Sequence, residues 1–213
     1  MKRTIAILTI TASIGLFAFC SKSEKTKWVY LFDGKTLNGW KAGTNASSFS
    51  VDSGHIVVKG PTAHLFYDGP VQNHDFKDFE FEAEVMTQPG ANSGIYFHTA
   101  YQSDGWPSKG YEVQVNNSQS DWRRTGSLYN IQDVKEVYVK DREWFREYIR
   151  VEGKHVIIKI NDKTVVDYTE PANPERPRGM EQRLISNGTF ALQAHDPNSV
   201  IYYRNIRVRG IFP

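Results

Sequence analysis

The stretches NSGIYFH at residues 92–98 and GYEVQV at residues 110–115 decide the fold predicted for this chain. Both alternate apolar side chains with polar or hydroxyl-bearing ones at a period of two residues, which is the spacing of a β-strand. We therefore expect two neighbouring strands that present a polar floor on one face of a sheet, with the loop between them as a wall. The residues expected on that floor are Tyr96, His98, Glu112 and Gln114.

The same alternation, together with turn dipeptides, predicts further strands along the chain. Gly-Pro pairs at residues 60–61 and 69–70 favour irregular structure at 60–74. No stretch shows the 3.6-residue apolar period of a helix. We predict an all-β fold, an antiparallel β-sandwich of jelly-roll type, as a single domain at residues 28–213. The other predicted strands cover residues 28–32, 49–51, 56–58, 76–85, 127–131, 143–151, 155–160, 164–168, 188–194 and 201–208.

The composition fits a folded domain that does not bind nucleic acid. Apolar residues make up 39% and aromatic residues 13% of the 213-residue chain, which is enough for a hydrophobic core. Without Lys2 and Arg3, which belong to the targeting segment described next, basic and acidic residues are equal in number. A neutral chain without basic runs lacks the cationic surface that nucleic-acid binding requires.

Residues 1–19 have the pattern of a targeting segment. A charged start precedes an apolar run that is too short for a transmembrane helix and typical of a signal peptide. The only cysteine, Cys20, follows that run and cannot form an intrachain disulfide. The segment resembles a bacterial lipoprotein signal, which implies acylation of Cys20 and a polar tether at residues 21–27. We therefore expect an exported bacterial lipoprotein, periplasmic or on the outer-membrane surface, that contacts the membrane through its lipid anchor only. An ordinary signal peptide is the alternative.

Six short motifs resemble the 3-keto-disaccharide hydrolase family, also described as 3-keto-glucoside lyase/hydratase domains. They occur in the family's order, and the resemblance covers residues 28–212. It implies a concanavalin A-like sandwich of two curved antiparallel sheets with ligands on the concave face. The chain departs from the family at His98, where many members carry arginine. The motifs are LFDGKTLNGW at 31–40, NSGIYF at 92–97, GYEVQV at 110–115, TGSLY at 125–129, LQAH at 192–195 and YRNIR at 203–207.

The resemblance implies cleavage of 3-keto-glycosides. A ketone at sugar carbon 3 acidifies the hydrogen on carbon 2. A base removes that proton, the enolate expels the glycosidic oxygen from carbon 1, and water adds to the glycal. Such an enzyme needs a general base, a donor or cation for the enolate oxygen, and an acid for the leaving group. We expect an oligosaccharide or oxidised glycoside as substrate and no cofactor, and the chain has no Gly-rich phosphate-binding loop.

Strand parity selects the candidate catalytic residues. Gln193 and His195 alternate with Leu192 and Ala194, so they would share a face with Glu112 if their strands lie in one sheet. We interpret Glu112 and His195 as the catalytic pair, because both side chains can titrate near neutrality when their surroundings tune them. The sequence does not decide which is the base and which the acid. A structural carboxylate and a hydrogen-bonded strand-end histidine are the alternative interpretations.

Candidate substrate-binding residues come from the same motifs and the loop between the first two strands. Polar and cationic side chains would bind sugar oxygens, and aromatic rings would stack on sugar rings. Structural cations and core aromatics are the alternatives. A non-catalytic carbohydrate-binding sandwich is likewise the alternative to an enzyme. The candidates are Asn92, Tyr96, His98, Trp106, Lys109, Tyr111, Gln114, Gln193 and Arg204.

Other constellations are weaker. Glu80, Glu82 and Glu84 resemble the Glu-x-Asp-x-Glu strand of family 16 glycoside hydrolases, which would make the protein a conventional glycosidase. The central aspartate is missing, however, and the outer pair would stand about 13 Å apart along a strand, whereas a retaining pair needs about 5–5.5 Å. We interpret the three glutamates as a solvated acidic face. A structural calcium ion is compatible with the fold, but no loop carries an Asp-rich ligand pattern, so we predict no metal site.

Overall fold

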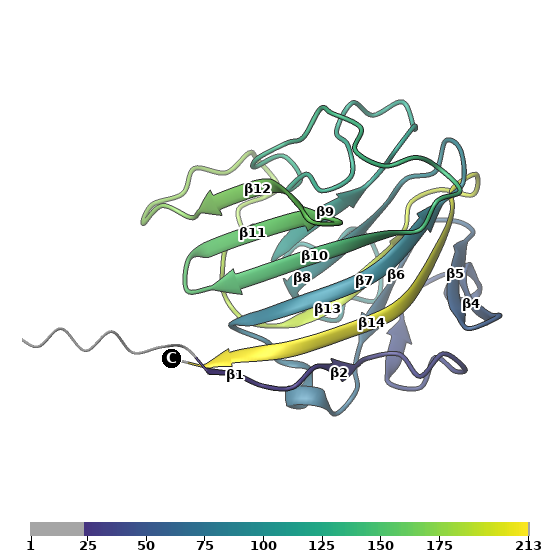
Figure 1. The fold of residues 1–213 in the computed structure, drawn as a ribbon, viewed down its shortest axis with the longest axis horizontal. Coiled ribbons are helices and arrows are strands. Elements are labelled where there is room, and N and C mark those ends of the chain that lie inside the picture. The colour runs from purple at the N-terminus through teal and green to yellow at the C-terminus, as the bar shows by residue number, and fades with distance from the viewer. Residues whose placement is uncertain (1–23, 213) are drawn as a thin grey trace, which may run out of the picture.

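Two antiparallel β-sheets pack face to face in the computed structural model of the protein, which describes residues 24–212 (Figure 1). The predicted all-β antiparallel sandwich is confirmed. The predicted signal segment at 1–19, Cys20 and the start of the tether lie outside the described residues. Between residues 24 and 212, no helix has the length and hydrophobicity needed to cross a membrane.

The larger sheet contains nine strands. Seven follow the order β12-β11-β10-β7-β14-β5-β4, and the short strands β1 and β2 also pair with β14. Their bounds are β1 (Glu24–Lys25), β2 (Val29–Tyr30), β4 (Phe49–Asp52), β5 (His55–Lys59), β7 (Phe79–Thr87), β10 (Phe145–Glu152), β11 (His155–Ile160), β12 (Lys163–Thr169) and β14 (Val200–Phe212).

The smaller sheet contains five strands in the order β3-β6-β13-β8-β9. The predicted neighbours β8 and β9 pair antiparallel, with Tyr96 directly opposite Glu112. Strand β13 pairs with β8 on its other side, so the motif around Gln193 joins the same sheet. The bounds are β3 (Trp40–Ala42), β6 (Ala63–Tyr67), β8 (Ser93–Thr99), β9 (Tyr111–Val115) and β13 (Thr189–Ala194), and the two 3₁₀ helices are η1 (Ala46–Ser48) and η2 (Val71–His74).

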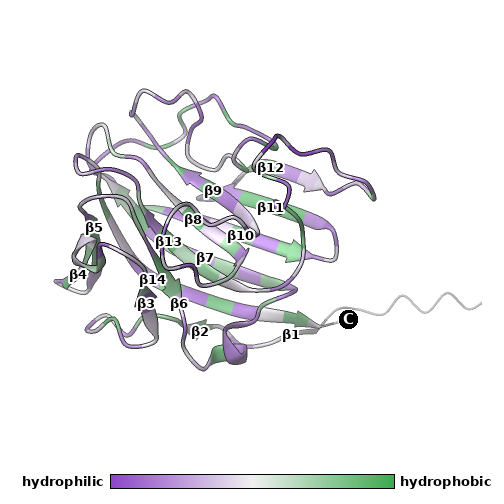
Figure 2. Ribbon diagram, turned by 180° about the vertical axis from the view of Figure 1, so that it is seen from behind, coloured by the Kyte–Doolittle hydropathy of each residue, from purple (hydrophilic) through white to green (hydrophobic). Residues whose placement is uncertain are grey.

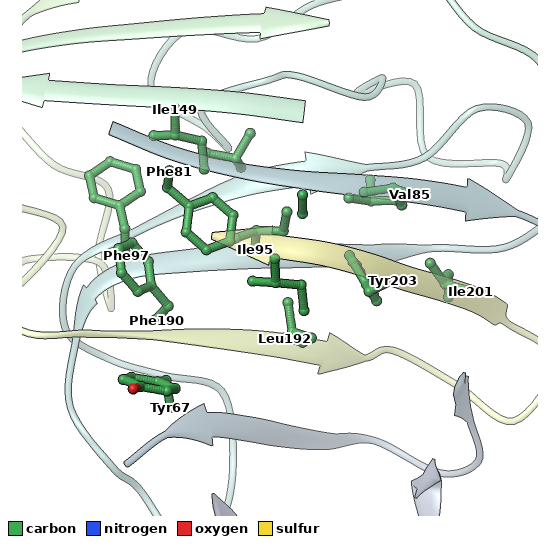
Figure 3. Close-up of a cluster of buried hydrophobic side chains, with 14 of the residues drawn as sticks. Tyr67, Phe81, Val85, Ile95, Phe97, Ile149, Phe190, Leu192, Ile201 and Tyr203 are labelled. Carbon is green, nitrogen blue, oxygen red and sulfur yellow. The ribbon is translucent and has the colours of Figure 1, made fainter. Parts of the chain in front are cut away.

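The hydrophobic core fills the space between the two sheets (Figure 3). It uses alternate residues along most strands, and in the larger sheet many residues on the other face are polar, as the bands of colour show (Figure 2). Each fully buried large side chain contributes about 1.5–3 kcal/mol to folding. The core includes Phe81, Val85, Ile95, Phe97, Ile149, Phe190, Leu192 and Tyr203, all with 0% exposure.

Strand β6 was not predicted, because residues 60–74 were expected to be irregular. All five residues of β6 are buried, since the core covers one face of the strand and loops cover the other. A strand buried on both faces shows no alternation, and here the two Gly-Pro pairs lie just outside its ends. The predicted strand at 127–131 is wrong: Leu128 makes only isolated bridges there, to Val113 and Gln132.

The outer face of the larger sheet carries a ladder of ion pairs between β7 and β14. Glu84, Glu82 and Glu80 face Arg204, Arg207 and Arg209 in register, with Nε–Oε2 distances of 2.6, 2.9 and 2.6 Å. A bulge between Arg204 and Arg207 keeps all three arginines on one face. The expected solvated acidic face is therefore wrong in its detail, because Glu80 and Glu82 are buried beneath their partners. Because each of the three glutamates is paired with an arginine, this strand does not favour glycosidase chemistry.

Glu147 on β10 is a carboxyl group buried in the core. It faces the core with Ile149, lies between Ala83 and Ile160 of the neighbouring strands, and is 0% exposed. Neither of its oxygens has a hydrogen-bond partner in the described part of the chain. Burial therefore raises the pKa of Glu147 well above its ordinary range, and the folded protein holds it as the neutral acid.

Replacing Glu147 by Met should stabilise the fold by about 1–3 kcal/mol, because the change removes a buried polar group without partners. The unfolded wild-type chain ionises Glu147 near pH 4.3 whereas the folded chain does not, so wild-type stability falls as pH rises above about that value. The advantage of the Met variant should therefore grow from acidic to neutral pH in urea unfolding curves. An exposed control, Glu136→Met, should show no such trend. A destabilised Glu147→Met protein would show that the carboxyl group has a partner that stabilises the fold.

Candidate active site

A cavity of about 360 Å³ lies on the face of the smaller sheet that points away from the core. Figure 2 views the molecule from the side of this sheet. Side chains of β8, β9 and β13, together with Asn92 just before β8, form the floor of the cavity. Three segments form its walls: the β8–β9 loop, residues 121–129, and the long loop before β13. The floor residues are Asn92, Tyr96, Glu112, Gln114 and Gln193.

Three floor side chains form a closed set of hydrogen bonds. The Tyr96 hydroxyl donates to Oε2 of Glu112 at 2.8 Å. The Gln193 amide Nε2 donates to Oε1 of Glu112 at 2.7 Å and lies 3.0 Å from the Tyr96 hydroxyl. Because one carboxylate oxygen accepts a hydrogen bond from β8 and the other from β13, Glu112 is held in one orientation on the floor.

The surroundings of Glu112 shift its acidity. Burial raises the pKa of Glu112 above the ordinary range of a glutamate, although Arg183, Tyr96, Gln193 and His195 act in the opposite direction. Glu112 is only 6% exposed. Since a carboxylate of raised pKa is a stronger base, the floor carries a positioned group suited to proton abstraction.

Two buried acceptors on the floor have no partner among residues 24–212. Gln114 donates through Nε2 to Oδ1 of Asn92 at 2.8 Å, which leaves its Oε1 unpaired. Oε1 of Gln193 is unpaired in the same way. A buried acceptor without a partner costs about 1–3 kcal/mol. Both residues line the cavity, so a ligand with hydroxyl groups would satisfy these acceptors.

Gly94 makes room for the carboxylate of Glu112. A Cβ atom at Gly94 would stand 2.9 Å from Cγ of Glu112 and even closer to Oε1. Gly94 pairs with Gln114 across the two strands, so it lies directly beneath the floor. The glycine of the NSGIYFH motif is thus required for close packing, and a methyl group there would displace the carboxylate.

We expect Gly94→Ala to lower kcat/KM for an oxidised glycoside substrate by about 100-fold. Moving a catalytic group by about 1 Å can cost that much in rate. The variant should remain folded, because the flexible Glu112 side chain can move aside. Steady-state kinetics beside a urea unfolding curve would separate the two effects. An active Gly94→Ala protein would show that the position of Glu112 does not matter.

Arg183 brings a positive charge to the cavity. Its guanidinium lies over the Tyr96 ring, 5.2 Å from the ring centroid, and Nη1 donates to the carbonyl of Gly110 at 3.2 Å. The residue is 6% exposed and lines the cavity. Since its charge favours the ionised form of Glu112, Arg183 opposes the effect of burial on the Glu112 pKa.

A buried cluster fixes the loop that carries Arg183. Arg176 donates through Nε to the carbonyl of Arg183 at 2.5 Å and through Nη2 to the Tyr111 hydroxyl at 2.6 Å. Glu170 accepts from the backbone N–H of Ile185 at 2.7 Å and from Tyr111. These contacts fix the loop around Arg183. Arg183 therefore has a defined position although it lies outside any strand.

His195 stands at the edge of the cavity just beyond the end of β13. Its Nδ1 lies 2.8 Å from Oδ2 of Asp196, and because a carboxylate only accepts, Nδ1 carries the hydrogen. Burial acts to raise the pKa of Asp196, but hydrogen bonds from His195, Ser199 and Asn198 lower it, so Asp196 stays ionised. His195 is thus oriented by an aspartate, as acid–base histidines commonly are.

Trp106 in the loop between β8 and β9 walls the cavity beside His195. Its ring lies 5.5 Å from the His195 ring, and its side chain is 48% exposed. The loop is fixed by Gln102, whose Nε2 donates to the Trp106 carbonyl at 2.9 Å. An exposed indole at the rim of a polar cavity offers a surface for a sugar ring.

His98 and Lys109, two predicted binding residues, lie outside the cavity. His98 has a left-handed backbone with φ of 55° and sits where the β13–β8 register shifts, so it leaves the face of Tyr96. It is buried instead, with Nε2 2.9 Å from the Lys77 carbonyl and Nδ1 accepting from Ser186 N–H at 3.2 Å. Lys109 donates to the Asn187 carbonyl at 2.7 Å.

Tyr111 and Arg204 are also placed elsewhere. Tyr111 faces the core, where its ring stacks on Phe97 at 5.5 Å. Arg204 belongs to β14 of the larger sheet, and its guanidinium stacks on Trp144 at 4.0 Å while bonding Glu84. Strand parity correctly gives the face of a residue where the strand is regular, but it does not say which sheet contains the strand.

The structure adds cavity residues that the sequence analysis missed. They come from loops. Strands are predicted from the periodicity of their side chains, and a loop has no such periodicity. The expected need for a donor or cation at the enolate oxygen was the one hint toward Arg183. Within residues 24–212, no group of three or more potential metal-ligating side chains is clustered. The added residues are Pro107, Ser108, Asp121, Tyr129, Gly179, Met180 and Arg183.

The chain resembles known carbohydrate-active proteins. Residues 27–209 match the family model described as 3-keto-alpha-glucoside-1,2-lyase-like domain. The 3-keto-disaccharide hydrolase of Bacteroides thetaiotaomicron is 27% identical, over 85% of this chain and 78% of that protein.

Solved structures share the sandwich. A candidate glycosyl hydrolase of Parabacteroides distasonis ATCC 8503 matches with a TM-score of 0.73 at 19% identity and covers 86% of this chain and 93% of that one. The carbohydrate-binding module CBM66 of Bacillus subtilis matches with a TM-score of 0.56 at 14% identity and covers 79% and 93%. At these identities the likeness shows the fold alone.

Proposed function

The chain belongs to the family of 3-keto-alpha-glucoside-1,2-lyase-like domains, and we propose that it cleaves 3-keto-glycosides by elimination followed by hydration. The family and the relative named 3-keto-disaccharide hydrolase support a carbohydrate-active enzyme. The observation that carries the reaction type is Glu112, a buried carboxylate of raised pKa that two donors hold on the floor of a cavity containing a guanidinium.

In the first step Glu112 acts as the general base. It takes the proton from carbon 2 of the sugar, and the C–H electron pair forms the enolate with the carbon-3 ketone. Negative charge develops on the ketone oxygen, and Arg183 supplies the fixed positive charge that stabilises it. Tyr96 and Gln193 keep Glu112 in place, while the unpaired acceptors of Gln114 and Gln193 bind sugar hydroxyl groups.

In the second step the enolate collapses and breaks the bond between carbon 1 and the glycosidic oxygen. A double bond forms between carbons 1 and 2, the carbon-3 ketone is restored, and the leaving oxygen needs a proton. His195, oriented by Asp196, is placed at the rim to supply it. Water then adds its oxygen to carbon 1 and gives a proton to His195, which restores the acid, while Glu112 returns its proton to carbon 2. The products are a 3-keto-sugar and a free sugar.

A non-catalytic carbohydrate-binding module is the second candidate. The fold resembles such a module, and Trp106 offers an exposed ring at the cavity rim. A binding module has no need for a buried carboxylate beside a cation, because an uncharged donor or acceptor would bind hydroxyl groups at lower cost. The floor of the cavity therefore favours the enzyme.

Turnover of 3-keto-trehalose beside unoxidised trehalose, with purified residues 21–213, tests the proposal. We expect release of glucose from the keto substrate alone, because only the ketone makes the carbon-2 proton removable. Cleavage of unoxidised trehalose would contradict the elimination. Binding of both sugars without cleavage, repeated with a second linkage, would favour the binding module.

A further inference from the structure

A second hollow of about 210 Å³ shares a wall with the main cavity. Residues 43–45, 62–64 and 102–105 line it. The His64 ring forms part of the shared wall, because it contacts the rings of Tyr96 and Trp106, with 5.4 Å between centroids in each case, and both of these residues line the main cavity. Gly105 lines the hollow, and the next residue, Trp106, lines the cavity. The hollow and the main cavity are therefore separated only by the aromatic rings of this wall.

The hollow is built from polar groups that hydrogen bonds hold in position. Thr44 N–H donates to the Ser103 carbonyl at 2.7 Å, and its hydroxyl donates to Oδ1 of Asp104 at 3.1 Å. On the opposite side, Asn45 Nδ2 donates to the Thr62 carbonyl at 2.9 Å. Asp104 is exposed, and the bond from Thr44 uses only Oδ1 of its carboxylate. Such a lining suits a neutral molecule with several hydroxyl groups, and the carboxylate disfavours an anion.

His64 provides a buried group without a partner in this wall. Its side chain is 3% exposed, and Nε2 has no hydrogen-bond partner in the described chain. Burial, with smaller contributions from Arg183 and His195, lowers the pKa of His64 to about 4, so the ring is neutral at physiological pH. A neutral imidazole can donate to or accept from a sugar hydroxyl without introducing charge.

The border between the two spaces lies beside the proposed acid. The Thr62 hydroxyl, in the lining of the hollow, donates to the His195 carbonyl at 2.7 Å. The His195 ring lies 5.5 Å from Trp106 on the side of the main cavity. A glycosidic oxygen that joins one sugar in the cavity to another in the hollow would therefore pass close to His195.

We propose that the hollow is the subsite for the leaving sugar and selects a neutral hexose there, with Asp104 and His64 as its recognition groups. The inference rests on the proposed function, because it assigns the keto ring to the cavity over Glu112. It also assigns the acid, since His195 stands where the bond between the two rings breaks.

The kinetic test compares 3-keto-trehalose, which releases glucose, with methyl 3-keto-glucoside, which releases methanol. We expect Asp104→Ala to lower kcat/KM for 3-keto-trehalose about tenfold relative to the methyl substrate. That is the effect of losing one hydrogen bond to a charged acceptor. Asp52→Ala, a control at the exposed end of β4, should leave the ratio unchanged. An unchanged ratio in Asp104→Ala would overturn the subsite.

A binding test keeps the subsite separate from the reaction. The imidazole NMR signals of His64, assigned by their loss in His64→Phe, should shift saturably when glucose is added to the wild-type protein and more weakly in Asp104→Ala. If neither keto substrate is cleaved, the proposed function fails, and this titration still decides whether the hollow binds sugar. Absence of any glucose-dependent shift in the wild-type protein would overturn the subsite.

Discussion

Replacing Glu112 by Gln should lower kcat for a 3-keto-glycoside by about 10³-fold, within the range that a general base contributes. The amide has the size of the carboxylate and keeps contacts with Tyr96 and Gln193, but it cannot accept the carbon-2 proton. Substrate binding should survive, because the other floor residues and Trp106 are unchanged. Single-turnover kinetics and a calorimetric titration with the keto substrate would measure both quantities.

Glu136→Gln is the matched control, since Glu136 is an exposed carboxylate away from the cavity. It should retain wild-type kcat. A Glu112→Gln enzyme with near wild-type turnover would remove Glu112 from the mechanism. Loss of sugar binding together with turnover would instead indicate a structural role for the carboxylate on the floor.

Arg183→Met should lower kcat/KM by about 10²-fold, comparable to the loss of one donor to a developing oxyanion. It should also change the pH profile. The active form of Glu112 is the carboxylate, and Arg183 favours that form, so removal of the cation raises the Glu112 pKa further. The acid limb of kcat/KM against pH should therefore move to higher pH.

Arg183→Lys separates charge from shape in this experiment. The lysine keeps a positive charge near Glu112 but loses the guanidinium contact over the Tyr96 ring and the geometry of the bond to Gly110. Its acid limb should stay close to that of the wild type even if its rate is reduced. An acid limb that does not move in Arg183→Met would show that the cation does not act on Glu112.

The floor of the cavity was predictable because a strand fixes the face of each residue. Tyr96, Glu112, Gln114 and Gln193 follow from a period of two and from the pairing of β9, β8 and β13. His98 departs from the alternation because its backbone is left-handed, and the residue type does not predict that conformation.

The walls and the second sheet were not predictable in the same way. Arg204 has the expected strand but lies in the larger sheet, because long-range pairing is not encoded in local alternation. Arg183 lies in a loop that Arg176 and Glu170 fix, and such contacts between distant side chains leave no periodic signal. Strand β6 was not predictable because both of its faces are buried, so its sequence lacks the alternation that marks a half-buried strand.

The most direct test of the account is the rate of cleavage of a 3-keto-glycoside that carries deuterium at carbon 2. Single-turnover conditions prevent product release from masking the chemical step. Removal of the carbon-2 proton by Glu112 predicts that the deuterated substrate reacts several-fold more slowly than the ordinary one, while deuterium at carbon 5 has no effect. Equal rates for the two substrates under these conditions would contradict removal of the carbon-2 proton in the chemical step and with it the central role of Glu112.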